Sequence, residues 1–210
     1  MDIFYTRLTK RLEDDNFNSY LSQLPLSMQE KIIKFHRWED SQLSLLGKIL
    51  LLTAFTSLGI SRDKINDVLY NEYNRPFFQD DLNFNISHSG QYVACVVHLG
   101  GEVGLDIEKI AEIDFEQFHD VFRPDELEQV RIDEDPIRKF YELWTKKEAI
   151  VKAIGEGLSW QLRSIDFKEK GIAEANGRTW YVKEVVLDKD YCCHVVSSSN
   201  VDPRKIFVQL

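Results

Sequence analysis

The sequence contains little glycine, proline or cysteine. Its 210 residues include 10 Gly, 5 Pro and 3 Cys, whereas hydrophobic residues make up 43% of the chain. Collagen-like and low-complexity architectures need far more Gly and Pro, and disordered chains have fewer apolar residues. Cys95, Cys192 and Cys193 are odd in number and lack C-x-x-C spacing, so they predict neither a disulfide framework nor a zinc site. A folded cytoplasmic protein with reduced thiols is the expectation.

A surplus of positive charge is also absent. The chain has 26 Lys and Arg against 35 Asp and Glu, a formal net charge of −9. Nucleic-acid-binding surfaces need excess Lys and Arg, so we expect no nucleic-acid partner, although a small basic pocket is compatible with this charge. Residues 1–15 lack an apolar signal core, and the longest strongly apolar stretch, 49–60, falls well short of the ~20 residues that span a bilayer. We therefore expect neither a secretory segment nor a membrane partner.

Apolar periodicity and turn residues predict a mixture of helices and strands. Strands are expected near residues 3–8, 84–87, 91–98, 104–108, 163–167, 179–187, 191–197 and 205–208. Helices are expected near residues 17–24, 27–38, 41–58, 115–122, 124–130 and 136–155. This mixture indicates an α+β protein.

Local signals sharpen some of these boundaries. Ser27 followed by Glu30 predicts a capping box at the start of a helix. Asp135 before Pro136 predicts an N-cap and first helical residue, and Gly155 predicts the end of that helix. His88-Ser89-Gly90 is expected to form a tight turn between two strands, whose backbone amides could receive phosphate oxygens.

A faint internal repeat divides the chain. An offset of 99 residues aligns Lys48, Leu51, Leu52, Ala54 and Phe55 with Lys147, Ile150, Val151, Ala153 and Ile154. The same offset aligns Tyr92, Val96 and Val97 with Tyr191, Val195 and Val196. One offset that serves both a helix and a strand predicts two similar α+β halves, residues 1–103 and 104–210.

Asp106 and Glu108 are two residues apart on a predicted strand, so both carboxylates leave the same face. Adjacent carboxylates repel each other unless a cation lies between them. A donor set made of oxygen suits a hard ion such as Mg²⁺, which often bridges to a substrate phosphate. The alternative is an ordinary solvated strand face.

The segment from Trp144 to Lys152 lies within the second long predicted helix. Glu148 and Lys152 are four residues apart and share one helix face, where they could offer a third metal ligand and a phosphate-directed charge. A surface ion pair worth a few tenths of a kcal/mol is the alternative. Trp144 is expected in the core in either case.

Other polar residues are candidates for binding phosphate. His88 could add a proton donor to its turn, although a single loop His is usually just exposed. Arg75 precedes Pro76 in a turn that fixes its position near the next strand. Lys31 belongs to a cluster of basic residues in the first half, which solvation of a helix face also explains.

In this order and spacing, the motifs resemble the 4′-phosphopantetheinyl transferase superfamily, specifically the longer type that activates peptide synthetases such as the surfactin synthetase. The matching segments are Leu45-Leu46-Gly47, Arg75-Pro76, 84–90, 104–108 and 144–152. Each motif is weak alone, whereas the combination is specific. The resemblance implies two α+β halves related by a pseudo-twofold axis, with antiparallel sheets and coenzyme A in the cleft between the halves.

The implied activity is that of a holo-[acyl-carrier-protein] synthase, or 4′-phosphopantetheinyl transferase. Such an enzyme transfers the 4′-phosphopantetheine arm of coenzyme A to a serine of an apo acyl or peptidyl carrier protein and releases adenosine 3′,5′-bisphosphate. Coenzyme A is the co-substrate and Mg²⁺ the cofactor, and a monomer is expected. The sequence does not indicate which carrier or pathway is served.

The resemblance also implies roles for individual residues. Asp106, Glu108 and Glu148 would hold Mg²⁺ against the pyrophosphate. Lys152 would contact phosphate and protonate the departing nucleotide oxygen, and Glu148 is the best candidate for the base that takes the serine proton. Whether Glu148 acts as ligand, base or both is open. The residues implied to hold the pyrophosphate, the 3′-phosphate and the adenine side are Lys31, Ser44, Arg75, Ser87, His88 and Lys152.

Two positions depart from the family pattern. Met28 lies one helical turn before Lys31, where some relatives have a second Lys, which predicts a weaker grip on the 3′-phosphate. Asn74 stands where Gly is usual and must adopt a turn geometry that Gly takes freely. The carrier surface is the least defined part, with a candidate patch at Phe115, Phe118, Phe122, Arg123 and Leu127, of which at least two Phe are expected in the core.

Two other functions fit the same residues. Three carboxylates with a Lys and a His also suit a magnesium-dependent phosphodiesterase or nuclease, which would use water in place of a carrier serine. A coenzyme-A-binding regulator without transfer activity would keep the nucleotide pocket. The regulator would be favoured if Glu148 or Lys152 were absent, and both are present.

Overall fold

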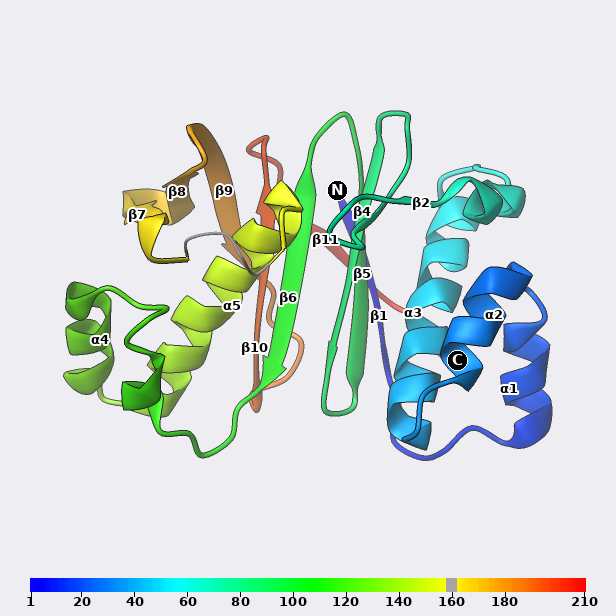
Figure 1. The fold of residues 1–210 in the computed structure, drawn as a ribbon, viewed down its shortest axis with the longest axis horizontal. Helices are drawn as coiled ribbons and strands as arrows, with labels where there is room; N and C mark the ends of the chain where they lie inside the picture. The colour runs from blue at the N-terminus through cyan, green and yellow to red at the C-terminus, as the bar shows by residue number, and fades with distance from the viewer. Residues whose placement is uncertain (158–161) are drawn as a thin grey trace.

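The computed structural model describes residues 1–157 and 162–210 as two α+β halves side by side (Figure 1). The first contains β1 (Asp2–Arg7), α1 (Asp14–Leu21), α2 (Leu26–Ile33), α3 (Trp38–Ser57), η1 (Arg62–Asp67), β2 (Leu69–Tyr70), β3 (Pro76–Phe77), β4 (Leu82–Ser89) and β5 (Tyr92–Leu99). The second contains β6 (Val103–Lys109), η2 (Phe115–Phe118), α4 (Pro124–Arg131), α5 (Pro136–Ile154), η3 (Leu162–Ser164), β7 (Asp166–Lys168), η4 (Glu169–Gly171), β8 (Ile172–Ala175), β9 (Arg178–Glu184) and β10 (Tyr191–Ser197). The α+β fold class is confirmed.

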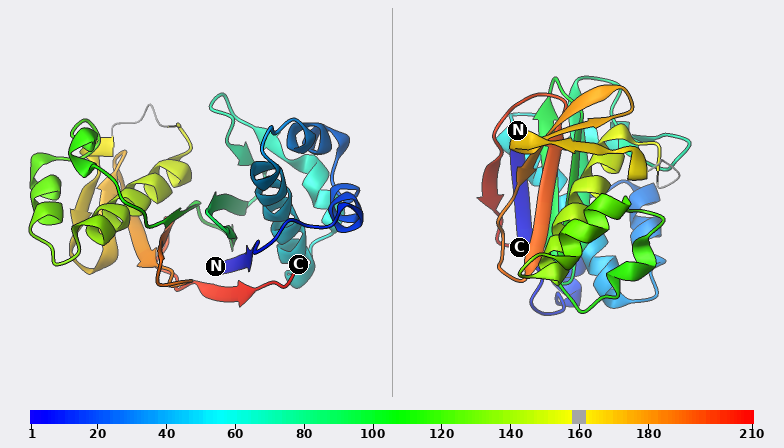
Figure 2. Two further views of the ribbon diagram at one scale, coloured as in Figure 1. Left: turned by 90° about the horizontal axis from the view of Figure 1, so that it is seen from below. Right: turned by 90° about the vertical axis from the view of Figure 1, so that its left-hand side faces the viewer.

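The two main sheets pair their strands in a similar way. The first has the order β11-β1-β5-β4, where β11 is Arg204–Phe207, and the second has the order β6-β10-β9-β8-β7. Asp2 pairs with Val97 in the antiparallel β1–β5 ladder, and Val103 pairs with Ser197 in the antiparallel β6–β10 ladder. In each half the first strand thus pairs antiparallel with the second strand of a hairpin, β4–β5 in the first half and β9–β10 in the second, as a pseudo-twofold relation requires. The last strand returns to the first sheet, where β11 runs parallel to β1 (Figure 2, left).

Each half covers its sheet with one long helix, α3 in the first and α5 in the second (Figure 1). Buried side chains from both sheets, including Val96, Leu105 and Val195, fill the space between the sheets. Gly104 lets β6 approach α5 closely, because a Cβ at this position would lie 1.9 Å from the carbonyl oxygen of Ala149. Within residues 1–157 and 162–210, no helix is both long and apolar enough to cross a membrane.

The edge strands β4 and β6 meet where the halves join, and polar side chains of β4 link them. The backbone N–H of Leu105 donates to Asn85 Oδ1 at 2.9 Å, and that of Lys109 donates to Ser89 Oγ at 3.0 Å. Between these bonds, the Ile107 N–H donates to Ser87 Oγ at 3.4 Å. Edge strands otherwise expose unpaired backbone groups. Every second residue of β4 therefore satisfies the edge of β6.

Several sequence predictions of local structure are confirmed. Asp135 caps α5, since its side chain accepts from the Arg138 N–H, and Gly155 ends the helix in the left-handed conformation. Asn74 has the expected positive φ of 60°.

Other local predictions are wrong. His88 and Ser89 lie within β4 and not in a turn, which is formed by Gly90 and Gln91, so the backbone amides of the predicted phosphate-binding turn belong to the β4–β5 hairpin. The capping box at Ser27 is absent because α2 begins at Leu26, after Pro25. The strand expected at 163–167 is a short 3-10 turn followed by β7.

The sequence analysis also missed β8. Strand β8 is joined to β9 by Asn176-Gly177, both at positive φ. An Asn-Gly pair of this kind is the strongest local signal for a hairpin, so the strand was detectable.

Candidate functional site

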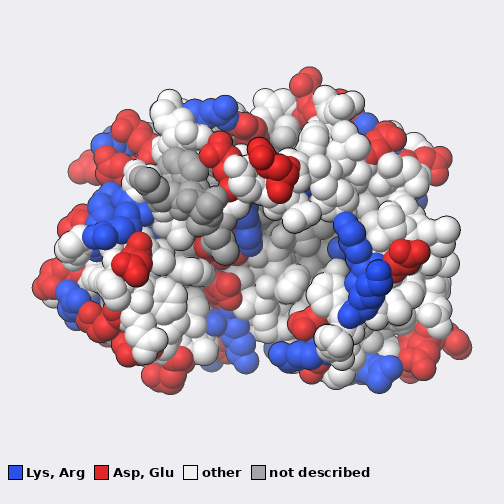
Figure 3. All heavy atoms as spheres, in the orientation of Figure 1, with Lys and Arg blue, Asp and Glu red and all other residues white. Residues whose placement is uncertain are grey.

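Six of the residues that the sequence predicts for the site line one cavity. It lies where β4, β6 and α5 meet and has a volume of about 300 Å³, and we call it the seam cavity. Figure 3 shows the surface hollowed between the two halves, with acidic and basic side chains along the hollow. The six residues are Ser87, His88, Asp106, Glu108, Glu148 and Lys152. Residues that are up to 65 positions apart in the chain thus share one site.

Lys152 is the central cation of the seam cavity. Its ammonium donates to Asp106 Oδ1 at 2.5 Å and to Ser87 Oγ at 2.9 Å. The Ser87 hydroxyl in turn donates to Asp106 Oδ1 at 3.0 Å. Ser89 donates to Glu108 Oε2 at 2.8 Å. These contacts hold the two acids of β6 and the Lys of α5 in a fixed arrangement, because each is bonded to β4.

The electrostatics of the cavity favour protonation of its acids. Burial, followed by the charges of Asp106 and Glu108, raises the pKa of Glu148 to about 7. Burial also raises the pKa of Asp106, although the Lys152 ammonium and the Ser87 hydroxyl act in the opposite direction. Burial and the Asp106 charge raise the pKa of Glu108. Three mutually repelling carboxylates with one ammonium leave a deficit of positive charge.

Two buried oxygens of these acids, Asp106 Oδ2 and Glu148 Oε1, have no hydrogen-bond partner within the described residues. Buried acceptors without a donor are rare and costly, so they indicate a missing cation or donor. The donor set, carboxylate oxygen throughout, fits Mg²⁺. Within 1–157 and 162–210, no three or more acidic, His or Cys side chains are already arranged around one metal position.

Arg75 lies at the edge of the cleft and bridges the two halves. Its guanidinium donates to the carbonyl of Ala153 at 2.7 Å, near the end of α5. It lines a neighbouring cavity together with Glu148 and Lys152. Burial lowers its pKa, while the charge of Glu102 has the opposite effect. The turn before it is held by Asn71, whose side-chain oxygen accepts from the Arg75 N–H at 2.9 Å.

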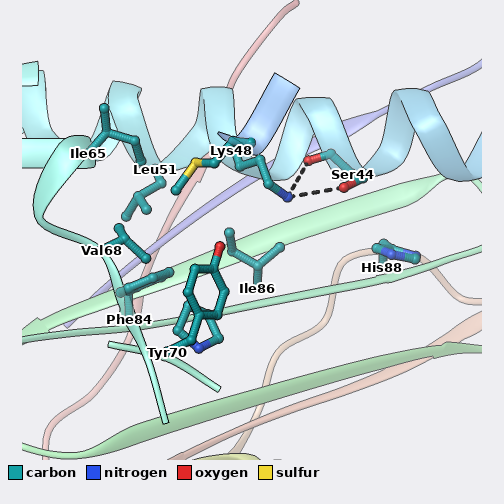
Figure 4. A pocket seen from close by; sticks show the side chains of 11 residues that line it. Ser44, Lys48, Leu51, Ile65, Val68, Tyr70, Phe84, Ile86 and His88 are labelled. Atoms are coloured by element: carbon teal, nitrogen blue, oxygen red, sulfur yellow. Dashed lines mark hydrogen bonds between the residues drawn. The ribbon is translucent and has the colours of Figure 1, made fainter. Parts of the chain in front are cut away.

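Lys31 and Ser44 lie at a second cavity, which is formed mainly by α3, β2 and β4 and has a volume of about 230 Å³ (Figure 4). We call it the α3 cavity. Ser44 lines it, and the Lys31 ammonium lies 3.9 Å from the centre of the Tyr70 ring, which also lines it. His88 lines both cavities and connects them. Lys48 also lines the α3 cavity, and apart from its place in the 99-residue repeat nothing in the sequence pointed to it.

The candidate carrier patch is partly buried. Phe122 and Leu127 belong to the core between α4 and α5. Phe118 packs against the rings of Phe140 and Trp144. Arg123 is held by Asp125 and by the carbonyl of Ile165. Phe122 and Leu127 are therefore not available to a partner, because their side chains are enclosed.

Family models and curated proteins identify the relatives of this chain. Residues 11–99 match the N-terminal 4′-phosphopantetheinyl transferase model, and residues 102–208 match the 4′-phosphopantetheinyl transferase superfamily model. The chain is 32% identical to the 4′-phosphopantetheinyl transferase gsp of Aneurinibacillus migulanus over 100% of this chain and 92% of that protein. It is 32% identical to the 4′-phosphopantetheinyl transferase Sfp of Bacillus subtilis over 79% of this chain and 74% of the relative.

A solved structure also aligns with the chain. The holo-[acyl-carrier-protein] synthase of Thermotoga maritima covers 46% of this chain with a TM-score of 0.35 and 15% identity. The family assignment rests on the sequence matches, which extend through both halves. The chain belongs to the 4′-phosphopantetheinyl transferase superfamily and is similar to its surfactin-synthetase-activating type.

Proposed function

We propose that this chain transfers the 4′-phosphopantetheine arm of coenzyme A to a serine of apo acyl or peptidyl carrier proteins. The products are the holo carrier and adenosine 3′,5′-bisphosphate. The observation that carries the proposal is the single cavity at which Asp106, Glu108, Glu148 and Lys152 meet Ser87 and His88. Phosphoryl transfer depends mainly on positioning and on charges near the phosphoryl oxygens, and this cavity brings three acids together with the Lys152 ammonium.

Asp106, Glu108 and Glu148 are the residues that would hold Mg²⁺ in this proposal. The unpartnered Asp106 Oδ2 and Glu148 Oε1 support a cation between these acids. When bound, Mg²⁺ would neutralise charge on the pyrophosphate oxygens. The acids need a cation for the same reason, since burial and then their mutual repulsion raise the pKa of Glu148.

Glu148 and Lys152 have separate roles in the proposed transfer. The carrier serine oxygen attacks the β-phosphorus, a new P–O bond forms, and the bond from that phosphorus to the bridging oxygen breaks. Glu148 takes the serine proton, since its carboxylate lies in the same cavity as Asp106 and Lys152. Lys152 lies beside Asp106 and Ser87, where it can donate to phosphate oxygens and protonate the departing oxygen.

The nucleotide part of coenzyme A is proposed to lie along the first half. Ser87 and His88 face the pyrophosphate in the seam cavity, while Lys31 and Ser44 bind at the α3 cavity. Arg75 adds a cation at the cleft edge. The lowered pKa of His88, caused by desolvation and then by the Lys152 charge, keeps its ring neutral at pH 7 as a hydrogen-bonding group.

We also propose that the chain works as a cytoplasmic monomer without a nucleic-acid or membrane partner. One chain supplies both walls of the seam cavity, so a second copy is not needed to complete it. The buried free thiols of Cys95, Cys192 and Cys193 suit a reducing compartment. The proposed boundary between the two halves lies at residues 103 and 104, at the start of β6, although β11 pairs with β1 of the first half.

A mass measurement tests the activity and separates the alternatives. The protein is incubated with coenzyme A, Mg²⁺ and several apo carrier proteins, and each carrier is weighed intact. Gain of one phosphopantetheine on a carrier is the expected result. Absence of any gain, with hydrolysed coenzyme A in reactions that lack a carrier, would instead indicate a phosphodiesterase. Binding of coenzyme A without either product would indicate a regulator.

A further inference from the structure

Lys48 projects from α3 into the α3 cavity, opposite the β4 residues Ile86 and His88 (Figure 4). Its ammonium donates to the carbonyl oxygen of Ser44 at 3.1 Å and to Ser44 Oγ at 3.0 Å. A lysine ammonium has three N–H bonds, so one is left for another acceptor. Among the described residues, no carboxylate forms an ion pair with it.

Other buried or half-buried lysines of the molecule have acidic neighbours, and Lys146 lies near the charges of Glu142 and Glu184. Lys147 pairs with Glu126 at 3.0 Å, and Lys152 pairs with Asp106 at 2.5 Å. A desolvated ammonium with no counter-charge is unfavourable in the protein alone, and burial lowers the pKa of Lys48 to about 8. The arrangement becomes favourable when an anion enters the cavity, because the ligand supplies the missing charge.

The surroundings of Lys48 are themselves cationic. Burial, followed by the charge of Lys31, lowers the pKa of Lys48. Burial, followed by the charges of Lys152 and, more weakly, Lys48, also lowers the pKa of His88, and among the described residues the charge of Asp40 has the opposite effect on His88. In a protein with a net charge of −9, this is a local basic pocket. It has the character of a phosphate-binding site.

We propose that Lys48 is a phosphate-binding residue of the α3 cavity and that its ligand is the ribose 3′-phosphate of coenzyme A. This assignment rests on the proposed function and adds to it a residue that determines co-substrate specificity. The aliphatic and aromatic lining of the cavity, such as Tyr70 and Phe84, fits the nucleoside that carries this phosphate.

The position of Lys48 distinguishes between the phosphates. The pyrophosphate has to reach the carboxylates and Lys152 in the seam cavity, on the other side of His88. Lys48 lines only the α3 cavity, so its partner is a phosphate outside the pyrophosphate. Coenzyme A has one such group, on the ribose. Met28 lines the same cavity without a charge, so Lys48 on α3 supplies a cation in place of one at position 28 of α2, and the weaker phosphate binding expected from Met28 is offset.

Calorimetric binding of coenzyme A and 3′-dephospho-coenzyme A to the whole chain tests this assignment. Lys48→Met is expected to raise the Kd for coenzyme A roughly 10- to 100-fold, as for loss of a charged hydrogen bond. It should change the Kd for 3′-dephospho-coenzyme A less than about twofold. The double variant Met28→Lys/Lys48→Met returns a cation to the cavity from α2 and should recover much of the lost affinity. Lys34→Met, which removes an exposed charge next to α2, is the matched control and should alter neither Kd.

The outcomes separate this assignment from the proposed function. Equal weakening of both ligands by Lys48→Met would place the charge at the pyrophosphate and overturn the assignment, as would unchanged binding of both. Thermal unfolding identifies a variant that fails to fold. If Lys48→Met does not fold, Lys48→Gln and Lys48→Arg replace it. Lys48→Gln should lose the preference for coenzyme A over 3′-dephospho-coenzyme A, and Lys48→Arg should keep it. If the wild-type chain binds neither ligand and modifies no carrier, the proposed function itself fails.

Discussion

The two halves of the molecule carry a lysine at corresponding positions of their long helices, and these lysines have different surroundings. The 99-residue offset aligns Lys48 of α3 with Lys147 of α5. Lys147 is 0% exposed, pairs with Glu126 and donates to the carbonyl of Leu162 at 2.8 Å. Lys48 is less enclosed, faces a cavity and is bonded only to Ser44 within the described residues.

The difference shows that a buried lysine can have either a structural role or a ligand-binding role, depending on whether the protein supplies its counter-charge. Lys147 brings its own counter-charge and ties α5 to α4, so its role is complete within the protein. Among the described residues Lys48 has no ion-pair partner, and in our proposal its role is completed by a ligand. The two halves also differ in charge. Residues 1–103 contain 10 basic and 13 acidic residues, whereas residues 104–210 contain 16 basic and 22 acidic ones. The proposed metal acids lie in the more acidic half.

The largest effect is expected from Asp106→Asn in the acidic half. It removes one charge from the proposed metal site with little change in shape, so kcat should fall 10³- to 10⁴-fold, or about 4–5.5 kcal/mol in barrier. Intact carrier mass against time measures the rate, and Tm verifies the fold. Asp15→Asn, at an exposed acid, should match the wild type. More than a tenth of the wild-type rate at saturating Mg²⁺ would contradict the assignment of Asp106.

Lys147→Met should sharpen the comparison of the two lysines through stability. The substitution leaves the Glu126 carboxylate buried without its cation, which is expected to lower the free energy of unfolding by about 3–5 kcal/mol. Lys48→Met removes an unpaired charge and should cost less than about 1 kcal/mol. Urea unfolding of both variants measures the two values. Equal losses would show that the two lysines have the same structural role.

His194 extends the comparison to a buried base of the second half. It contacts Thr145 Oγ1 at 2.8 Å, and burial, followed by the charge of Lys146, lowers its pKa to about 3. The unfolded His binds a proton below about pH 6.5 and the folded one only below about 3, so stability is lost as the pH falls. At pH 5 this loss is about 2 kcal/mol relative to pH 7.

Two substitutions test this pH dependence in unfolding experiments at pH 7 and pH 5. His194→Gln keeps a hydrogen-bonding group but cannot titrate, so on going from pH 7 to pH 5 it should lose about 2 kcal/mol less stability than the wild type. Comparing the two chains cancels the opposite contribution of Glu148, whose raised pKa of about 7 adds stability as the pH falls. His119→Gln changes an exposed ring and should respond to pH as the wild type does. An equal response of His194→Gln and the wild type would exclude the buried neutral state of His194.

Arg75→Ala should have the smallest effect, and it tests the contact between the halves. Loss of the hydrogen bond to the Ala153 carbonyl is expected to cost about 1–2 kcal/mol of stability. The KM for coenzyme A should rise about tenfold with kcat nearly unchanged, since the charge lies at the cleft edge. Arg75→Lys keeps the charge without the planar guanidinium, so its KM for coenzyme A should lie between those of the wild type and Arg75→Ala. A drop in kcat alone would contradict a binding role.

Much of the fold follows from local sequence signals. Asp135, Gly155 and the alternation around Asp106 predicted α5 and β6, because capping and side-chain alternation depend on near neighbours. The turn at His88 was predicted wrongly. Ser, His and Ser resemble loop residues, whereas in the structure Ser87 and Ser89 bond to the neighbouring strand of the other half.

Some residues of the candidate site were likewise predictable from the sequence, and others were not. The identities of its acids and of Lys152 were available from motif spacing, and all of them line the seam cavity. The role of Lys48 was not available, because a lysine in a helix gives no local sign of its partner. Burial and the absence of a carboxylate are properties of the packing around α3.

The sequence by itself determined the kinds of chemistry present: acids at strand and helix spacing, a deficit of positive charge, and two similar halves. Tertiary structure decided which charges meet. Lys147 has a carboxylate beside it while Lys48 faces a cavity, since α4 covers one lysine and not the other. The physical reason is that electrostatic energies depend on distance and burial, and residues far apart along the chain acquire both only when the two sheets come together.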